Sequence, residues 1–156
     1  ISSYDLTKIN KDNFILINKA LYDFDNKEVK FFSSKNKNYV SHSINDWQND
    51  YKKNSDFIKV NTITIKSILN QYNIHELEIL KLDIEGAEIK VIKNILSEKI
   101  FPIQILVEFD ELNKINELAI SKFEEVHQLL LSKNYKLIKT NNNFPNFLYI
   151  RQTDSI

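Results

Sequence analysis

The chain has 156 residues, with 21 basic and 21 acidic side chains, so its formal net charge at pH 7 is zero. Zero net charge argues against partners such as nucleic acid or an anionic membrane surface, and no apolar run approaches the ~20 residues of a membrane span. The chain contains no cysteine, which excludes disulfides and thiolate chemistry. From its first residues we expect no signal peptide. We therefore expect one cytoplasmic domain, large enough to bury ~70% of its unfolded surface.

The first apolar segment is the run at residues 14–17, which is typical of a buried strand. Asn18 and Ala20 follow this run, and the Asp and Asn within residues 25–27 favour a turn. We expect residues 28–32 to return as the antiparallel partner of the first strand, so that the two form a hairpin.

A polar segment, residues 33–56, separates this hairpin from the next strand. It is rich in Ser, Asn, Lys and Asp and predicts a long loop. Ser41, His42 and Ser43 could line the mouth of a pocket, but a solvated loop is the preferred interpretation for all three. The pattern assigns no catalytic role to this segment.

The following segment predicts a strand and a short helix. Residues 57–63 have the pattern of a strand. Thr64 is a good N-cap for a helix over residues 65–72, whose isoleucine and leucine side chains are expected to point inward.

The central motif is the stretch Leu-Lys-Leu-Asp-Ile-Glu-Gly-Ala-Glu at residues 80–88, which contains Gly86, the only glycine in the chain. A residue without Cβ is needed where the backbone turns sharply or approaches another group closely. The residues before the turn predict a strand, and apolar residues recur at helical spacing after it. Asp83, Glu85 and Glu88 place three carboxylates at this corner, which folding alone does not require.

A second acidic strand end follows the helix. Residues 103–107 predict a buried strand that ends at Glu108. Because a helix joins the two acidic strands, they predict a parallel, right-handed crossover unit. Asp83 and Glu108 are then expected to face the same cleft.

The C-terminal part of the chain predicts a long helix and a hairpin. Apolar side chains recur at helical spacing over residues 116–132, and the expected core stripe is Ala119, Phe123, Val126, Leu130 and Leu131. Asn134 suits the left-handed residue that ends such a helix. Residues 136–140 and 147–151 are expected to form the two antiparallel strands of the hairpin.

The residues Lys-Leu-Asp-Ile-Glu-Gly-Ala-Glu of the central motif resemble the signature of the FkbM-type S-adenosylmethionine-dependent methyltransferases, in which this turn closes the fourth strand. The Ile-Leu-x-Glu pattern that ends at Glu108 and the Asn-x-Ala-Leu pattern at Asn18 and Ala20 match the same family. The resemblance covers residues 14–151 and implies a Rossmann-like methyltransferase sheet, largely parallel, with an antiparallel C-terminal hairpin.

The resemblance also implies S-adenosylmethionine as the cofactor. It places Asn18 and Ala20 beside the adenine and makes Asp83 a further cofactor contact. A plain hairpin is the alternative interpretation of the segment that contains Asn18 and Ala20, and on the residues alone it is the preferred one.

The family holds its cofactor with a glycine-rich turn after the first strand, whereas the single glycine of this chain already serves the acidic turn. The resemblance therefore implies a partial methyltransferase domain that lacks the first two strands. Without them, the strands at residues 14–17 and near Leu80 have open inner edges, through which a homo-oligomer could form. The chain alone is expected to bind the cofactor weakly or not at all.

The resemblance implies methyl transfer to a hydroxyl group of a sugar, a glycan or a secondary metabolite, so the partner is a small-molecule or glycan acceptor. A carboxylate beside the acceptor oxygen can take its proton as it attacks the methyl group. Asp83 is the first candidate for this base, with Glu108 and Glu85 behind it. Glu88 is interpreted as an acid that the helix macrodipole favours at the helix N-terminus, and for Glu85 the same interpretation stays open.

Two other functions remain open on the sequence alone. Asp83, Glu85 and Glu108 could hold Mg²⁺ for phosphoester hydrolysis, although the neutral charge argues against a DNA partner. Alternatively, the chain is a non-catalytic fragment that serves as an interaction domain. The methyltransferase interpretation, which is preferred, includes no metal site.

Overall fold

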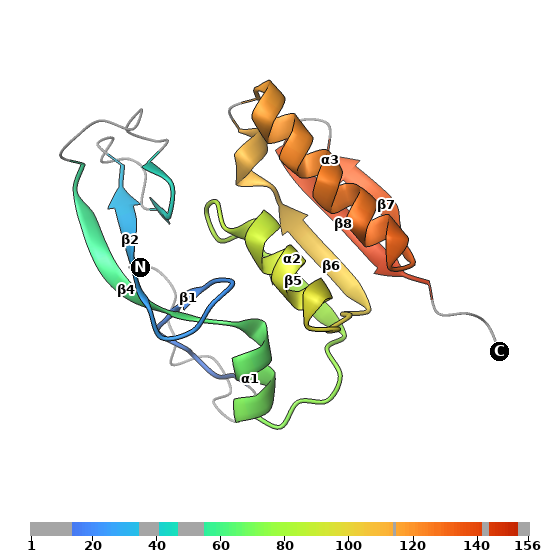
Figure 1. Ribbon diagram of the computed structural model, residues 1–156, viewed down its shortest axis with the longest axis horizontal. Coiled ribbons are helices and arrows are strands. Elements are labelled where there is room, and N and C mark those ends of the chain that lie inside the picture. The colour runs from blue at the N-terminus through green and yellow to red at the C-terminus, as the bar shows by residue number, and fades with distance from the viewer. Residues whose placement is uncertain (1–13, 35–40, 47–54, 114, 142–143, 153–156) are drawn as a thin grey trace.

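The computed structural model describes residues 14–34, 41–46, 55–113, 115–141 and 144–152. These residues form two four-stranded sheets and three α-helices (Figure 1). The α/β class that the sequence predicted is confirmed. Within the same ranges, no helix is both long and apolar enough to cross a membrane.

The first sheet has the strand order β1-β4-β2-β3. β4 (Phe57–Ile63) is parallel to the short β1 (Ala20–Leu21) and antiparallel to β2 (Glu28–Ser33). β3 (His42–Ser43) pairs with the end of β2 and forms one edge of the sheet. The strand that the sequence predicted at residues 57–63 is confirmed.

The prediction of a strand at residues 14–17 is wrong. This segment has no regular secondary structure, and its first three side chains are 45, 57 and 70% exposed. The chain enters the sheet only at Ala20, which pairs with Thr62 of β4. Because the backbone groups of a strand need a hydrogen-bonded neighbour, an apolar run alone does not make a strand, and β2 takes β4 as its antiparallel partner instead.

The helix α1 (Ile65–Gln71) follows β4 directly, and Thr64 caps it as the sequence predicted. The Thr64 side chain accepts a hydrogen bond from the backbone N–H of Ser67 at 3.1 Å. The carboxylate of Asp25 accepts hydrogen bonds from the Thr64 backbone N–H at 2.7 Å and from the Ser67 hydroxyl at 2.8 Å. Asp25 thereby ties the loop between β1 and β2 to the start of α1.

The second sheet has the order β5-β6-β8-β7 and carries the acidic motif. β5 (Ile79–Leu82) and β6 (Gln104–Glu108) are parallel neighbours joined by α2 (Glu88–Ser97), which confirms the predicted strand–helix–strand unit. β7 (Tyr135–Asn141) and β8 (Phe144–Arg151) form the predicted antiparallel hairpin, and β8 lies between β7 and β6.

A single, largely parallel sheet is not what the structure shows. Among the described strands, the pairs β1–β4 and β5–β6 are parallel, and the other four pairs are antiparallel. The antiparallel pairs arise because β2 returns beside β4 and because β8 reverses between β6 and β7. Each of the strands β1 and β5 has a described neighbour on one side only, as the sequence predicted for the strand at Leu80.

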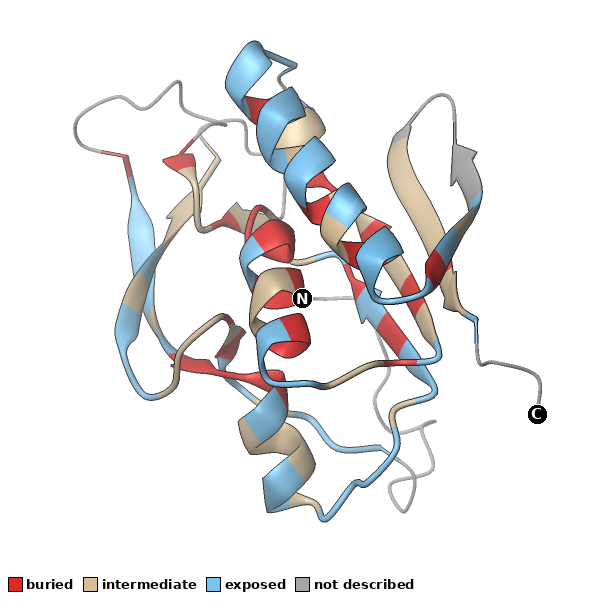
Figure 2. Ribbon diagram, turned by 45° about the vertical axis from the view of Figure 1, so that its right-hand side comes forward, coloured by how far each residue is buried: buried red, intermediate tan, exposed pale blue. Residues whose placement is uncertain are grey.

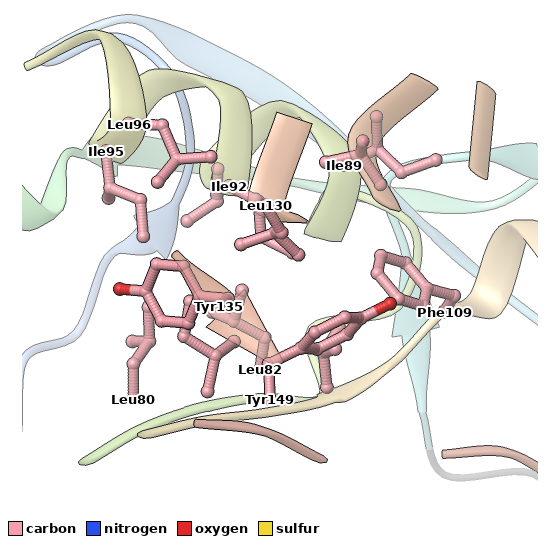
Figure 3. Close-up of a cluster of buried hydrophobic side chains, with 14 of the residues drawn as sticks. Leu80, Leu82, Ile89, Ile92, Ile95, Leu96, Phe109, Leu130, Tyr135 and Tyr149 are labelled. Carbon is pink, nitrogen blue, oxygen red and sulfur yellow. The ribbon is translucent and has the colours of Figure 1, made fainter. Parts of the chain in front are cut away.

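The core lies between the second sheet and the helices α2 and α3 (Glu117–Ser132), where Figure 2 shows most of the buried positions. Figure 3 shows side chains of both helices packed over side chains of the sheet. Residues with side chains that are fully buried in this cluster include Leu82, Ile92, Ile105, Leu130 and Tyr149. Burial of each such leucine or isoleucine contributes roughly 2 kcal/mol, so this cluster is the main stabilising unit beneath the acidic motif.

Most of the core stripe predicted for the C-terminal helix, α3, is confirmed. The residues of the stripe that face the core are the buried Ala119, Val126 and Leu130 and the partly buried Phe123. Leu131 was predicted wrongly, since it is 39% exposed. A helix turns by about 100° per residue, so Leu131 points away from the stripe that Leu130 occupies. Asn134 has the predicted left-handed conformation, with φ of +64°.

Candidate active site

Two neighbouring strands end in acidic residues at the same edge of the second sheet. β5 and β6 run parallel, with Leu82 opposite Val107 in their register. Asp83 and Glu108 come next in the two strands, so the structure brings both to this edge. Glu85 joins them, since the charges of Asp83 and Glu108 both act on its carboxyl group. The carboxyl ends of parallel strands are where α/β proteins bind ligands, so this acidic edge is the candidate site.

Asp83 is the exposed member of the group. Its side chain is 44% exposed, and one carboxylate oxygen lies 2.8 Å from the ammonium nitrogen of Lys81. An ion pair this exposed contributes only about 0–1 kcal/mol to stability. Stabilisation of the fold by this ion pair is therefore too small to account for an acidic residue at this position. The Asp83 carboxylate is open to a solute at the sheet edge.

Glu85 lies in the turn between β5 and α2 with φ of +61°, a left-handed conformation that is uncommon for residues other than glycine. Burial is the main cause that raises the pKa of its carboxyl group, and the charges of Asp83 and Glu108 act in the same direction. A hydrogen bond with the Ser41 side chain acts in the opposite direction. A carboxyl group whose pKa is raised is a candidate proton acceptor near neutral pH.

Gly86 occupies a position that no other residue fills without strain. Its φ is +104°, and a Cβ atom at this position would lie 2.5 Å from Nδ2 of Asn45. The Asn45 amide needs this space because it donates a hydrogen bond to the Gly86 carbonyl oxygen at 2.9 Å. The only glycine of the chain thus serves both a sharp turn and a close approach.

We expect Gly86→Ala to lower the free energy of unfolding by about 2–4 kcal/mol, because backbone strain of about 1–3 kcal/mol adds to displacement of the Asn45 amide. Urea denaturation followed by circular dichroism measures the loss. Combining Gly86→Ala with Asn45→Ala separates the two causes, since the double variant lacks the clash and keeps the strain. Wild-type stability in Gly86→Ala alone would contradict this account of the turn.

Glu88 is fully buried and closes the turn from the inside. Its carboxyl oxygens accept hydrogen bonds from the backbone N–H groups of Ile84 at 2.9 Å and Gly86 at 3.0 Å. Burial is the main cause that raises the pKa of Glu88 to about 8, and the charge of Glu111 adds to it. Glu88 does lie in the first turn of α2, as the sequence suggested, but its role is to satisfy the backbone of the acidic turn.

Two further acids, to which the sequence pattern assigned no role, belong to the same cluster. Asp110 and Glu111 begin the short 3-10 helix η4 (Asp110–Leu112), which follows β6. Burial is the main cause that raises the pKa of Asp110 to about 7, and the charges of Glu85 and Glu108 add to it. Asp110 Oδ2 is buried and has no hydrogen-bond partner in the part of the chain that is described. The sequence signal that could have pointed to Asp110 and Glu111 was the concentration of acidic residues directly after a buried strand.

Residues 41–45, expected to be a solvated loop, also belong to the site. Ser43 is fully buried, and both Ser43 and Asn45 donate hydrogen bonds to the acidic turn. No local pattern marks these residues, because their partners lie 42 and 41 residues away along the chain.

The predicted cofactor contacts Asn18 and Ala20 lie on the first sheet and the segment that leads into it. Asn18 is exposed ahead of β1, and Ala20 is buried within β1. No hydrogen bond or ion pair between described residues joins either of them to the acidic edge, so their role stays a prediction. Nor do the described side chains include a group of three or more His, Cys, Asp or Glu residues that could hold a metal ion.

Comparison with known proteins agrees with the motif. The family model of the methyltransferase FkbM domain matches residues 5–137. The match includes the acidic turn, Glu108 and α3 but ends before β8, whereas the resemblance inferred from the motifs extended to residue 151. No curated protein and no solved structure matches the chain. Because the family model covers most of the residues of this chain, the chain belongs to the FkbM family of methyltransferase domains.

Proposed function

We propose that this protein transfers a methyl group from S-adenosylmethionine to a hydroxyl group of a sugar, a glycan or a secondary metabolite. Methyltransferase activity in general follows from the family. The observation that supports the hydroxyl acceptor is the acidic edge, where Asp83, Glu85 and Glu108 come together within the residues that match the family model. In this proposal, β5, α2 and β6 represent part of a Rossmann-like methyltransferase fold.

The acidic edge suits the proposed cofactor in charge and in hydrogen bonding. When bound, S-adenosylmethionine supplies an electrophilic methyl group on a positively charged sulfur. Carboxylates accept hydrogen bonds from ribose hydroxyls, and the buried Asp110 Oδ2 lacks a partner among the described residues. Asn18 and Ala20 are proposed to contact the adenine, as the family resemblance implies. The only glycine is committed to the acidic turn, so residues 1–156 contain no glycine-rich turn that would add affinity for the cofactor.

The carboxylates of the edge would take up the proton of the acceptor hydroxyl. Loss of this proton makes the acceptor oxygen a better nucleophile toward the methyl group. Asp83 is the first candidate for the base because its carboxylate is open to a solute. Glu85 is the second, because burial raises the pKa of its carboxyl group, and Glu108 raises it further through its charge. Holding the acceptor in line with the methyl group supplies much of the rate in such displacements.

Transfer of tritium from S-adenosylmethionine labelled on its methyl group tests the proposal. The acceptors are oligosaccharides and hydroxylated small molecules, each compared with an analogue whose hydroxyl groups are blocked. The protein is assayed both as its cell makes it and as residues 1–156. We expect labelled product from the protein as the cell makes it and none with the blocked analogues.

Calorimetric titration of residues 1–156 with S-adenosylhomocysteine and, separately, with Mg²⁺ complements this assay. We expect weak binding of S-adenosylhomocysteine, because the chain has no glycine-rich turn to hold it. Micromolar or tighter binding would contradict that expectation. If the protein as the cell makes it neither transfers the label nor binds the cofactor product, a non-catalytic interaction domain becomes the better description.

A further inference from the structure

A segment of the first sheet, residues 41–45, lies against the acidic turn of the second sheet. It contains the strand β3, which is the teal arrow near the loop that precedes α2 in Figure 1. We call residues 41–45 the turn clamp. Because the turn clamp belongs to the first sheet and the acidic turn to the second, their contacts join the two sheets at the candidate active site.

The turn clamp holds two successive carbonyl groups of the acidic turn. The Ser43 hydroxyl donates a hydrogen bond to the Glu85 carbonyl oxygen at 2.7 Å, and the Ile44 backbone N–H donates to the same oxygen at 3.2 Å. The Asn45 side-chain amide donates to the Gly86 carbonyl oxygen at 2.9 Å. The Ser43 hydroxyl also accepts a hydrogen bond from the Asn45 backbone N–H at 3.0 Å, so it is used as both donor and acceptor.

These contacts hold the peptide group between Glu85 and Gly86 from both sides. Ser43 and Ile44 bind its carbonyl oxygen, and the Glu88 carboxyl group accepts a hydrogen bond from its N–H. A left-handed conformation of a residue such as glutamate persists only where its surroundings impose it. The fixed peptide group imposes this conformation on Glu85, and the backbone conformation in turn sets the direction of its side chain.

We propose that Ser43 and Asn45 are positioning residues, which hold the Glu85 carboxylate at the acidic edge for the proton transfer of the methylation reaction. This inference rests on the proposed function. Neither residue needs to touch the acceptor, since each acts through the backbone of the turn. It follows that the acidic edge is competent only when the first sheet is docked against the second.

The test measures methyl transfer by Ser43→Ala and Asn45→Ala, each alone and each combined with Glu85→Gln, in the protein as the cell makes it. We expect each single substitution to lower the rate about 10- to 100-fold, because small misplacements of a catalytic group have effects of this size. In the Glu85→Gln background the same substitutions should cause no further loss, because no carboxylate remains to be positioned.

Ser55→Ala is the matched control. Ser55 is also buried, and its hydroxyl donates a hydrogen bond to Asp46 at 2.7 Å. This hydrogen bond is formed next to the turn clamp and not with the acidic turn. The control should therefore keep a rate close to that of the wild type, even if it lowers the melting temperature.

A second measurement needs neither cofactor nor acceptor. Titration of the Glu85 carboxyl group of residues 1–156, followed by carbon-detected NMR, measures the pKa of this group. Burial is the main cause that raises this pKa, while Asp83, Glu108 and the Ser41 hydroxyl also face the group. Release of the turn should expose the carboxyl to water, so its pKa should fall in Ser43→Ala and Asn45→Ala and stay unchanged in Ser55→Ala.

The outcomes separate failure of the inference from failure of the proposed function. If Ser43→Ala or Asn45→Ala lowers the rate in the Glu85→Gln background as much as it does alone, the turn clamp is only structural. Wild-type rates in both single variants, with an unchanged Glu85 pKa, would also overturn the inference. If the wild-type protein transfers no methyl group, the proposed function fails and the positioning role fails with it. If the fully buried Ser43 does not tolerate alanine, Asn45→Ala, at a partly exposed position, carries the test.

Discussion

Asp83→Asn is expected to lower the rate of methyl transfer about 100- to 10,000-fold, the range typical of a lost general base. Asparagine keeps the shape of the side chain but cannot take up the proton of an acceptor hydroxyl. The fold should survive, because the Asp83 side chain is 44% exposed and an ion pair such as that with Lys81 is worth only about 0–1 kcal/mol. Turnover and thermal melts measured on the same protein check both parts of this prediction.

Two alternative roles for Asp83 give different results. A smaller loss, confined to the affinity for S-adenosylmethionine, would make Asp83 a binding residue. A capping role would leave turnover unchanged, but the structure gives that role to Glu88, which accepts the hydrogen bonds of the turn. Glu98→Gln is the matched control, because it removes a carboxylate that forms an ion pair with Lys66 just beyond the far end of α2. Unchanged turnover in Asp83→Asn would leave Glu85 and Glu108 as the candidate bases.

The free energy of unfolding is expected to fall as the pH rises from about 4.5 to about 8, because Glu88 binds its proton more tightly in the folded state. Burial raises the pKa of Glu88 from 4.5 to about 8. Below both values the carboxyl is protonated in the folded and the unfolded chain alike. Between them the unfolded chain releases the proton and the folded chain keeps it, so each pH unit favours unfolding by up to about 1.4 kcal/mol. Asp110, with its pKa raised to about 7, acts in the same direction.

Glu88→Gln isolates the contribution of this residue. Glutamine resembles the protonated carboxyl group, since its oxygen can accept from the turn and its amide can donate toward Glu111. Urea denaturation at pH 5 and pH 8 should show a smaller pH dependence in this variant and a stability at pH 8 above that of the wild type. Glu125→Gln, which removes an exposed partner of Lys93, should keep the wild-type pH dependence. An unchanged slope in Glu88→Gln would mean that Glu88 is already ionised in the folded protein.

The sequence by itself determined the strand–turn–helix–strand unit that carries Asp83 and Glu108. Its signals are local: apolar periodicity specifies β5, α2 and β6, and the only glycine marks a turn that requires a positive φ. The Thr64 cap, the left-handed Asn134 and the C-terminal hairpin were predictable for the same reason. Each of these features depends on residues that are close together in the chain.

Only the tertiary structure decided which strands pair and which polar residues complete the site. The apolar run at residues 14–17 has the composition of a strand, but strand formation depends on a hydrogen-bonded neighbour, and β4 pairs with β2 and β1 instead. Ser43 and Asn45 look like loop residues until the first sheet meets the acidic turn, about a quarter of the chain away. Glu88 and Asp110 hold raised pKa values because packing removes water from them, and no pattern of neighbouring residues in the chain encodes that burial.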